Sequence, residues 1–454
     1  MSQSRPDSSV DAASDVSGIG ALRGRSLLEG SDLVLAFARV LHANGQSTDQ
    51  TLAVAGRLAN GLGLSATIIA GWEGVQIRAA AGNSLLASFV AASPTGVDMD
   101  RVAGTMRAVA SVDAGGISLP AAIEMVKEIA NRPPAPTWLF ALAAAAGAAA
   151  LSVIFGVEHL GAIALIVASS AAGAVLRRAI SRHSTNALLQ PLCAALLAGM
   201  IGALATRCNL SSSLRLVAVC PCMILVPGPH FLNGMMDLSA ARVTLGTSRL
   251  IFAGLVVTAI SVGLLLGLGI LGVALPVDGP GRAVPLWLDV ISAGVAVAAY
   301  SIFFSTPLRM LGWPVAVGML AHALRWWTLA GGASAATGAF VACLAVGIIL
   351  TPIARRSHMP FAAIGFASVV SMIPGVFLFR MASGLIQLAH DSNAPSELWA
   401  ATVANAMTAV TIILAMGFGL ILPKLAIDRL GDSATRSEVL IGGRDAKSEH
   451  PTRS

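Results

Sequence analysis

Charged side chains are scarce in this sequence, which argues against an ordinary soluble protein. Asp, Glu, Lys and Arg make up 11% of the 454 residues and hydrophobic residues make up 56%, whereas soluble domains carry about 25% charged residues. Cysteine is also sparse, and no Cys-x-x-Cys pair occurs among Cys193, Cys208, Cys220, Cys222 and Cys343. The sequence therefore predicts no disulfide framework and no metal site.

Several sequence motifs of nucleotide-binding, zinc-binding and hydrolytic proteins are missing as well. The chain has no Walker A sequence, no zinc signature and no Gly-x-Ser-x-Gly elbow, so ATP hydrolysis and familiar hydrolase chemistry lack support, and no cofactor is expected. Although the formal net charge is +6, no dense Lys/Arg patch is interleaved with aromatic residues. Nucleic acid is therefore not an expected partner, whereas the lipid bilayer is.

Ten apolar runs follow a more polar N-terminal region, and most approach the ~20 residues that a membrane-spanning helix needs. They cover residues 138–156, 160–176, 187–206, 214–238, 250–274, 287–306, 308–326, 333–352, 360–388 and 399–422. The expected fold is an α-helical polytopic membrane protein with ten transmembrane helices.

The fourth and ninth runs are each interrupted by a Pro-Gly pair. Pro227-Gly228 and Pro374-Gly375 lie 147 positions apart, and similar residues surround both pairs. This repetition predicts two five-helix membrane repeats, over residues 133–275 and 276–423. Because five is an odd number, the second repeat enters the bilayer from the opposite side, so the two repeats are inverted.

The remaining segments are more polar than the apolar runs. Residues 1–30 and 424–454 are expected to be disordered tails. Residues 31–132 combine helical periodicity with short β-prone runs around Trp72-Glu73-Gly74, and the prolines of 132–136 end this segment as a stiff linker. A small α+β domain is predicted there. The basic residues of the loops favour the side that holds this domain, which predicts that both termini are cytoplasmic.

The Pro-Gly pairs are the main functional candidates. A broken membrane helix leaves backbone amides and carbonyls unpaired, which is tolerable only against protein or a watery cavity and allows the half-helix ends to bind a charged ligand. We therefore expect Pro227, Gly228, Pro374 and Gly375 to belong to a substrate site. The competing interpretation is a simple kink, which the repetition of the break makes less favoured.

Polar side chains near the first break supply further candidates. His230, Asn233 and Asp237 are spaced by three and four residues, so they share one face of a helix. We expect Asn233 to contact the substrate and His230 and Asp237 to couple transport to protons, because ionisable groups within a membrane are costly and usually functional. Asp237 beside Arg242 is equally compatible with a helix end at the interface.

Three residues of the second half complete the set. Arg380 is expected either to hold a substrate carboxylate or to extend to the membrane interface. Asp289 is a third proton-coupling candidate, although its early place in the helix also favours an interfacial position. His322 stands next to Arg325-Trp326-Trp327 and is expected at the interface, where aromatic residues gather.

Four short motifs occur in a characteristic order. Met223–Gly228 and Asn233–Asp237 precede Phe303–Pro307 and Met372–Gly375. This order resembles the threonine/serine exporter family of bacterial inner membranes, in the form that fuses both membrane blocks, and Gly45–Thr48 and Gly61–Leu64 are similar to its N-terminal pattern. Pro229 and His230 depart from many relatives. The resemblance implies efflux of L-threonine and L-serine driven by the proton motive force.

Other classes of protein stay open. A carrier or a channel for another small polar metabolite would share these breaks, and a dependence of flux on the proton gradient would separate the two. A membrane-embedded enzyme would use Glu73, His42, Asp98 or Asp100 of the N-terminal region, which form no recognisable constellation. The sequence also leaves a homo-oligomer open.

Overall fold

The computed structural model describes residues 27–81, 84–113, 118–210, 215–277, 283–357, 359–391 and 393–448. The chain divides into two compact units, of which unit 1 comprises Met1–Pro134 with Asp237–Arg249, and unit 2 comprises Ala135–Met236 with Leu250–Ser454. The chain passes from unit 2 to unit 1 within α9 (Gly228–Ser239) and returns within α10 (Val243–Ile270).

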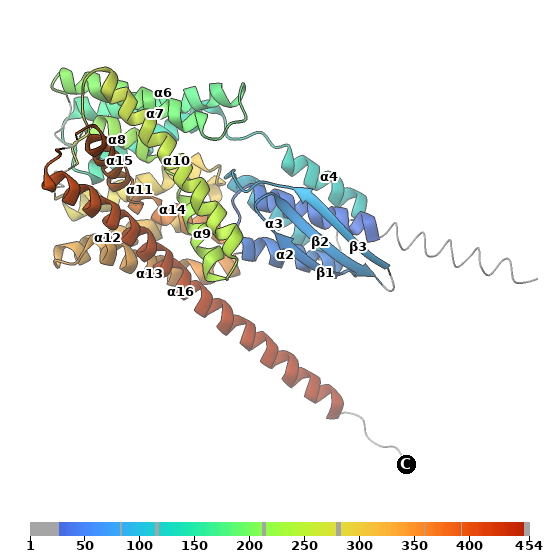
Figure 1. Ribbon diagram of the computed structural model, residues 1–454. Coiled ribbons are helices and arrows are strands. Elements are labelled where there is room, and N and C mark those ends of the chain that lie inside the picture. The colour runs from blue at the N-terminus through green and yellow to red at the C-terminus, as the bar shows by residue number, and fades with distance from the viewer. Residues whose placement is uncertain are drawn as a thin grey trace, which may run out of the picture. The chain divides into compact units, whose positions relative to one another are not determined.

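Unit 1 combines helices with a three-stranded antiparallel sheet in the order β1-β2-β3. A helix over residues 27–43 precedes α2 (Thr48–Gly61), β1 (Ser65–Ala70), β2 (Gly74–Ala81), β3 (Ser84–Ala91), α3 (Met99–Asp113) and α4 (Leu119–Ala130). The hairpin expected around Trp72-Glu73-Gly74 is present as β1 and β2, beside α2 (Figure 1). Val75 and Ile77 of β2 are fully buried, as a strand with one face on a core requires.

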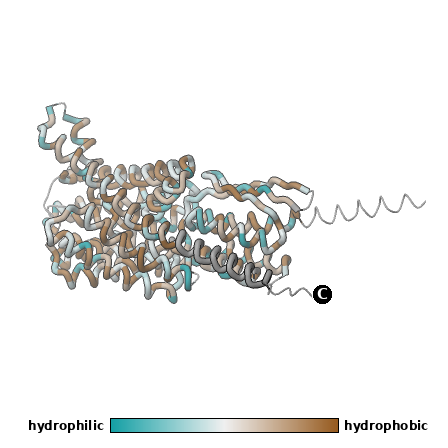
Figure 2. The backbone as a smooth tube through the Cα atoms, turned by 90° about the horizontal axis from the view of Figure 1, so that it is seen from below, coloured by the Kyte–Doolittle hydropathy of each residue, from teal (hydrophilic) through white to brown (hydrophobic). Residues whose placement is uncertain are grey.

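Unit 2 is built from helices. In chain order these are α5 (Thr137–Ile154), α6 (Leu160–Ser181), α7 (Leu189–Arg207), α8 (Leu216–Met223), α9, α10, α11 (Leu286–Phe303), the 3₁₀ turn η1 (Leu308–Met310), α12 (Gly312–Ala330), α13 (Ala335–Arg356), α14 (Phe361–Val369), the 3₁₀ turn η2 (Val370–Met372), α15 (Gly375–His390) and α16 (Ser396–Ser448). Hydrophobic residues dominate these helices over most of their length (Figure 2).

Seven helices of the described chain are long and apolar enough to cross a membrane. The pairs α8–α9 and α14–α15 bend by 52° and 51° at their breaks and raise the number to nine if each pair is one span. These are the two interrupted runs of the sequence. The run expected over 308–326 corresponds to α12, which is not among the nine because His322, Arg325 and three tryptophans lower its hydropathy. The chain is thus a mostly helical, polytopic membrane protein.

Parts of both segments that were expected to be disordered tails are helical in the structure. Residues 27–30 are helical, and Leu27 is only 3% exposed, so apolar burial begins before Ser31. At the other end α16 includes the membrane-span candidate Ser396–Ile427 and continues beyond it through Ser448. The tail predictions were wrong for these residues, while 1–26 and 449–454 lie outside the described residues.

Candidate functional site

The two helix breaks have the same backbone conformation. The amide of Gly228 donates to the carbonyl of Val226 at 2.9 Å, and the amide of Gly375 donates to that of Ile373 at 2.8 Å. Each hydrogen bond spans one proline, and the φ of −77° and ψ of 50° at Pro374 are those of an inverse γ-turn. Proline suits this turn because its ring fixes φ and it has no amide to leave unpaired.

The two breaks also lie against each other. A Cβ atom added to Gly228 would stand 2.2 Å from Cδ1 of Ile373 in the second break. Reciprocally, a Cβ atom on Gly375 would stand 3.3 Å from Met223 and 3.4 Å from Val226 in the first. A side chain at position 228 would require Ile373 to move, and the structure brings the four predicted break residues together.

One carbonyl released by the first break is satisfied from outside its own helix. The hydroxyl of Tyr300 on α11 donates to the carbonyl of Met223 at 3.1 Å, and Tyr300 is 2% exposed. It is the single tyrosine of the chain. A buried phenol needs such a partner, so this side chain holds α11 to the end of α8.

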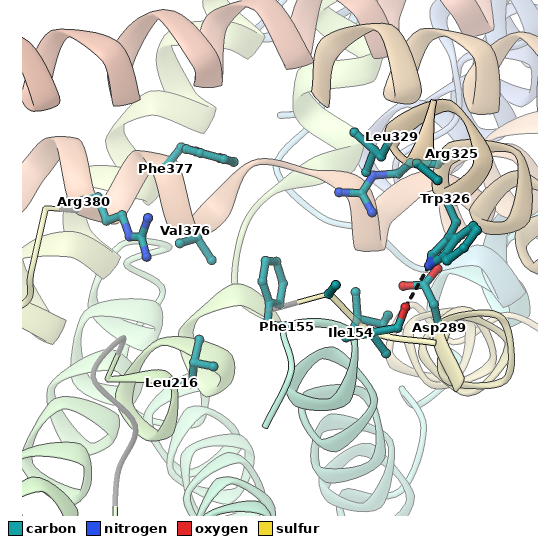
Figure 3. A pocket seen from close by; sticks show the side chains of 13 residues that line it. Ile154, Phe155, Leu216, Asp289, Arg325, Trp326, Leu329, Val376, Phe377 and Arg380 are labelled. Atoms are coloured by element: carbon teal, nitrogen blue, oxygen red, sulfur yellow. Dashed lines mark hydrogen bonds between the residues drawn. The ribbon is translucent and has the colours of Figure 1, made fainter. Parts of the chain in front are cut away.

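A cavity of about 520 Å³ adjoins the second break in unit 2, within the range of ligand pockets. Its wall comprises Ile154, Phe155, Leu216, Ala283, Val284, Asp289, Arg325, Trp326, Leu329, Ala330, Val376, Phe377 and Arg380. Arg380 enters it from α15 and Arg325 from α12, and Asp289 lies beside Trp326 (Figure 3). The structure thus brings Asp289 and Arg380 into one cavity, and two cations with one anion among apolar side chains suit a small zwitterion.

A hydrogen bond joins the segment that precedes α11 to the C-terminal part of α12 at this cavity. The indole Nε1 of Trp326 donates to the carbonyl of Val284 at 2.8 Å, the interaction drawn in Figure 3. Val284 immediately precedes the helix on which Asp289 stands. This hydrogen bond therefore fixes the first turn of α11, where a carboxylate is favoured by the helix dipole.

Asp289 is joined to the second break through His322. Nδ1 of His322 lies 3.0 Å from Oδ2 of Asp289, and its Nε2 lies 2.8 Å from Oγ of Ser371 in η2. The three residues are 4%, 1% and 5% exposed. Each of these side chains thus finds its polar partner inside the protein. The interfacial positions expected for His322 and Asp289 stay predictions.

The other two polar residues of α9 in unit 2 are buried. His230 is 6% and Asn233 is 2% exposed, and the ring of His230 meets that of Phe252 edge-on with centroids 5.1 Å apart. Neither residue lines the cavity described above. Their assignment to substrate or protons stays a prediction.

Asp237 belongs to a cluster of ion pairs in unit 1. Its Oδ2 lies 3.0 Å from Nε of Arg249, and its Oδ1 lies 3.5 Å from Nη1 of Arg242. Arg242 also pairs with Asp49, and Arg249 donates to Oγ1 of Thr48 at 3.5 Å. Asp237 is 2% exposed, so it is not a solvated residue at a helix end, and it has two cationic partners.

A second, much smaller cavity of about 10 Å³ adjoins the first break. Ser169, Ser170 and Arg177 of α6 line it, with Pro221 and Ile224 on the other side. The hydroxyls of both serines and two guanidinium nitrogens of Arg177 are buried without a hydrogen-bond partner. The volume is sufficient for about one water molecule, which these donors could hold.

The N-terminal residues weighed as catalytic are engaged locally. His42 Nε2 donates to the carbonyl of Gly71 at 2.9 Å, and Asp98 and Asp100 are ion-paired with Arg101 and Arg132. Unit 1 does contain a hollow of about 780 Å³, but neither these three residues nor Glu73 line it. Among the described residues no group of three or more His, Cys, Asp and Glu side chains is placed to hold a metal.

Sequence reasoning found Asp289, Arg380 and both breaks, but missed the roles of Tyr300, Arg325, His322 and Ser371. His322 is 33 positions from Asp289 and 49 from Ser371, so no local spacing relates them. The available signal was the presence of a histidine and an aspartate within apolar runs, which membrane burial makes costly unless they are paired.

Comparisons with known proteins agree with this architecture. The threonine/serine exporter family matches residues 32–271, and "Threonine/Serine exporter, ThrE" matches residues 289–426. A Mycobacterium tuberculosis (strain ATCC 25618 / H37Rv) protein named "Probable threonine/serine exporter" is 26% identical over 391 residues, which cover 80% of this chain and 70% of that protein. No solved structure matches. Because the first match alone covers more than half of the chain and the two together contain both breaks, the chain belongs to the threonine/serine exporter family of membrane transporters and is not an enzyme.

Proposed function

We propose that this protein exports L-threonine and L-serine across the bacterial inner membrane and that the proton motive force drives the export. The observation that carries the proposal is the cavity beside the second break, with Arg380, Arg325 and Asp289 in its wall. An amino acid is a small zwitterion, so its carboxylate suits an arginine and its ammonium suits the aspartate. The name of the family supplies the two amino acids.

We further propose ten membrane spans in two inverted repeats, with α12 as the tenth. Helix contacts recur with the repeat period, since α5, α6 and α7 pack on α8 as α11, α12 and α13 pack on α14. The contact of α5 with α11 and that of α8 with α15 cross between the halves. A two-fold relation between the repeats accounts for this pattern, with α5 and α11 nearest its axis.

The substrate site is proposed to lie where the breaks meet. Pro227, Gly228, Pro374 and Gly375 present half-helix ends there, and Arg380 and Asn233 occupy equivalent positions of the two repeats. With both termini in the cytoplasm, α5 runs outward and Ile154 is at its outer end, so the cavity lies on the outer side. Rocking of the repeats would open the opposite side in turn. Residues 31–132 form a cytoplasmic domain in this topology.

The test is efflux of labelled threonine from preloaded cells, with and without a protonophore. Wild-type chain is expected to export threonine in competition with serine, and the protonophore should abolish the export. The double variant Pro227→Ala/Pro374→Ala should lose it, because both γ-turns depend on proline. Pro352→Ala is the matched control, since it removes a proline from within α13 away from the breaks.

Unchanged threonine and serine flux on expression of the wild-type chain would refute the substrate assignment. The remaining candidate would be a carrier for another small polar metabolite. Flux that ignores the protonophore would instead refute the coupling and favour a channel or a facilitator.

A further inference from the structure

We propose that Asp289 and His322 together form the proton-binding site of the transport cycle and that Ser371 transmits its charge state to the second helix break. The inference rests on the proposed function and deepens it by naming the atoms that hold the coupled proton. It is carried by the hydrogen-bonded chain from the cavity wall at Asp289 through His322 to η2.

The position of the chain is suited to a proton site. Asp289 lines the cavity, so its carboxyl can exchange protons with water there, whereas His322 and Ser371 do not line it. All three side chains are at least 94% buried. Of the three, only Asp289 thus reaches the cavity, and a proton taken up there can act on the break through His322 and Ser371.

The charged groups around the pair are few among the described residues. α11 contributes Asp289 itself, and α12 contributes Arg325, one turn beyond His322, whose charge interacts with Asp289. η2 contributes the uncharged Ser371, and α15 adds Arg380 across the cavity. The described part of α14 has no ionisable side chain, and α13 has Arg355 and Arg356 in its last turn. The Asp289 carboxylate thus faces Arg325 and Arg380. Addition of one proton to the Asp289–His322 pair therefore makes the net charge of this region more positive by one.

The hydrogen bonds change direction with the proton. An ionised carboxylate can only accept, so in the unprotonated pair Nδ1–H of the neutral ring donates to Asp289 and the Ser371 hydroxyl donates to Nε2. When the ring gains one proton, Nε2 becomes a donor to Oγ of Ser371. The serine hydroxyl must then turn its own hydrogen to another acceptor.

This reversal acts directly on the break. Ser371 lies three positions before Pro374. It stands inside the turn that is closed by the hydrogen bond from the amide of Ile373 to the carbonyl of Val370. The break contains carbonyls that no helix satisfies, so a redirected hydroxyl has acceptors nearby. Proton binding and the geometry of the γ-turn at Pro374 are therefore coupled through one side chain.

A hydrolase triad uses the same three residue types, but this arrangement is different. The serine of a triad must face the substrate, and Ser371 is 5% exposed and absent from the cavity wall. Asp237, the other buried carboxylate considered, is ion-paired with Arg249 and Arg242. It does not line the cavity beside the second break.

The experiment compares exchange with gradient-driven transport in proteoliposomes. Threonine exchange needs no net proton movement, whereas uphill transport in an imposed pH gradient does. His322→Gln should retain exchange within about twofold and lose at least about tenfold of uphill transport, a difference of about 1.4 kcal/mol in coupling. Asp289→Asn should also lose uphill transport, but it should slow exchange as well, because Asp289 is proposed to bind the substrate ammonium. Uphill transport by His322→Gln at the wild-type rate would overturn the proposal, as would equal loss of exchange and uphill transport in His322→Gln.

The role of Ser371 has its own matched control. Ser368 is a buried serine of α14 whose hydroxyl bonds to the carbonyls of Pro314 and Ile364 and not to His322. Ser371→Ala should reduce uphill transport more than exchange, whereas Ser368→Ala should leave their ratio unchanged. Equal ratios in the two variants would show that Ser371 does not transmit the proton's effect.

A readout that needs no substrate separates this inference from the proposed function. Val376 lies in the cavity wall two residues after Pro374, so the alkylation rate of Val376→Cys in a cysteine-free chain reports on the break. After correction for the thiolate fraction of the cysteine, since the thiolate is the reactive form, that rate should change across pH 5 to 8, and His322→Gln should flatten the change. A flat wild-type profile would overturn the proton site, while absent threonine flux with a pH-dependent profile would overturn only the proposed substrate.

Discussion

Arg380 extends into the cavity from the second turn of α15, which places a guanidinium close to the half-helix end at Gly375. We expect Arg380→Gln to raise the KM for threonine by about 10- to 100-fold with a smaller change in kcat, because a hydrogen bond to a charged group contributes about 1.5–3 kcal/mol. Arg380→Lys should be intermediate, since lysine keeps the charge but not the planar fork.

The measurement for Arg380 is the concentration dependence of threonine transport in proteoliposomes. Arg309→Gln is the control, because Arg309 is an exposed arginine of η1 outside the cavity wall. An unchanged KM in Arg380→Gln would show that the guanidinium does not contact the substrate.

His42 should make the stability of unit 1 depend on pH. Burial, aided by the charge of Arg249, lowers the pKa of His42 from 6.5 to about 4. Above pH 6.5 the ring is neutral in both the folded and the unfolded state, so His42 does not reduce the free energy of unfolding. Between pH 6.5 and 4 only the unfolded chain takes up the proton, so the free energy of unfolding falls by up to about 3 kcal/mol.

Thermal unfolding of the full-length protein at pH 7 and pH 5 tests this prediction. His42→Gln keeps a donor for the Gly71 carbonyl but does not titrate, so the fall on acidification should be smaller by about 2 kcal/mol. The same pH dependence in both proteins would mean that other groups cause it.

Individual side chains could be singled out from the sequence only where their burial in a membrane would carry a high free-energy cost. Asp289 and Arg380 are charges within apolar runs, and burial of charge is expensive enough to indicate function. The sequence could not say that Asp289 reaches His322, because that contact depends on the packing of α11 against α12. For the same reason the sequence did not show that His322 contacts Ser371.

At the scale of elements, α10 packs against α7 at a distance that only glycine allows. A Cβ atom on Gly267 would lie 2.4 Å from the carbonyl oxygen of Leu196 and 2.8 Å from the amide of Met200. Both are backbone atoms, so no side chain can move aside. Gly267→Ala should destabilise the protein by about 1–3 kcal/mol, the usual cost of overpacking.

The control for this prediction lies on the same helix. Nothing lies within 4 Å of a Cβ atom added to Gly254, so Gly254→Ala should be neutral or stabilising by up to about 1 kcal/mol through helix propensity. The melting temperature in detergent distinguishes the two variants. A lower melting temperature for Gly254→Ala than for Gly267→Ala would contradict the close approach.

The broken helices were the most predictable elements, because proline and glycine change backbone chemistry wherever they occur. The apolar pattern alone was less reliable at helix ends. It predicted a disordered tail over 424–454, where α16 continues to Ser448. Charged residues indicate where a chain leaves the bilayer, but they do not indicate where a helix ends.

At the scale of the molecule, the proposed repeat of 147 residues is indicated in the sequence mainly by the two Pro-Gly pairs, because many of the positions that it relates carry different residues. Position 325 is arginine and its equivalent 178 is also arginine, but Arg380 corresponds to Asn233 and Phe377 to His230. The two halves therefore offer different chemistry at equivalent places. An asymmetric proton site in the second repeat alone is compatible with that divergence.

An inverted repeat also predicts the cavity of the other access state. Applying the period to the observed wall maps Ile154 onto Ser301, a fully buried residue whose hydroxyl has no hydrogen-bond partner. A polar side chain in such a place is explained if it faces water in the other state. In a cysteine-free chain, Ile154→Cys should react with a membrane-impermeant reagent from outside and Ser301→Cys from inside. Conditions that quicken one reaction should slow the other, because opening one side closes its equivalent. Reaction of both cysteines from the same side would refute the inverted arrangement.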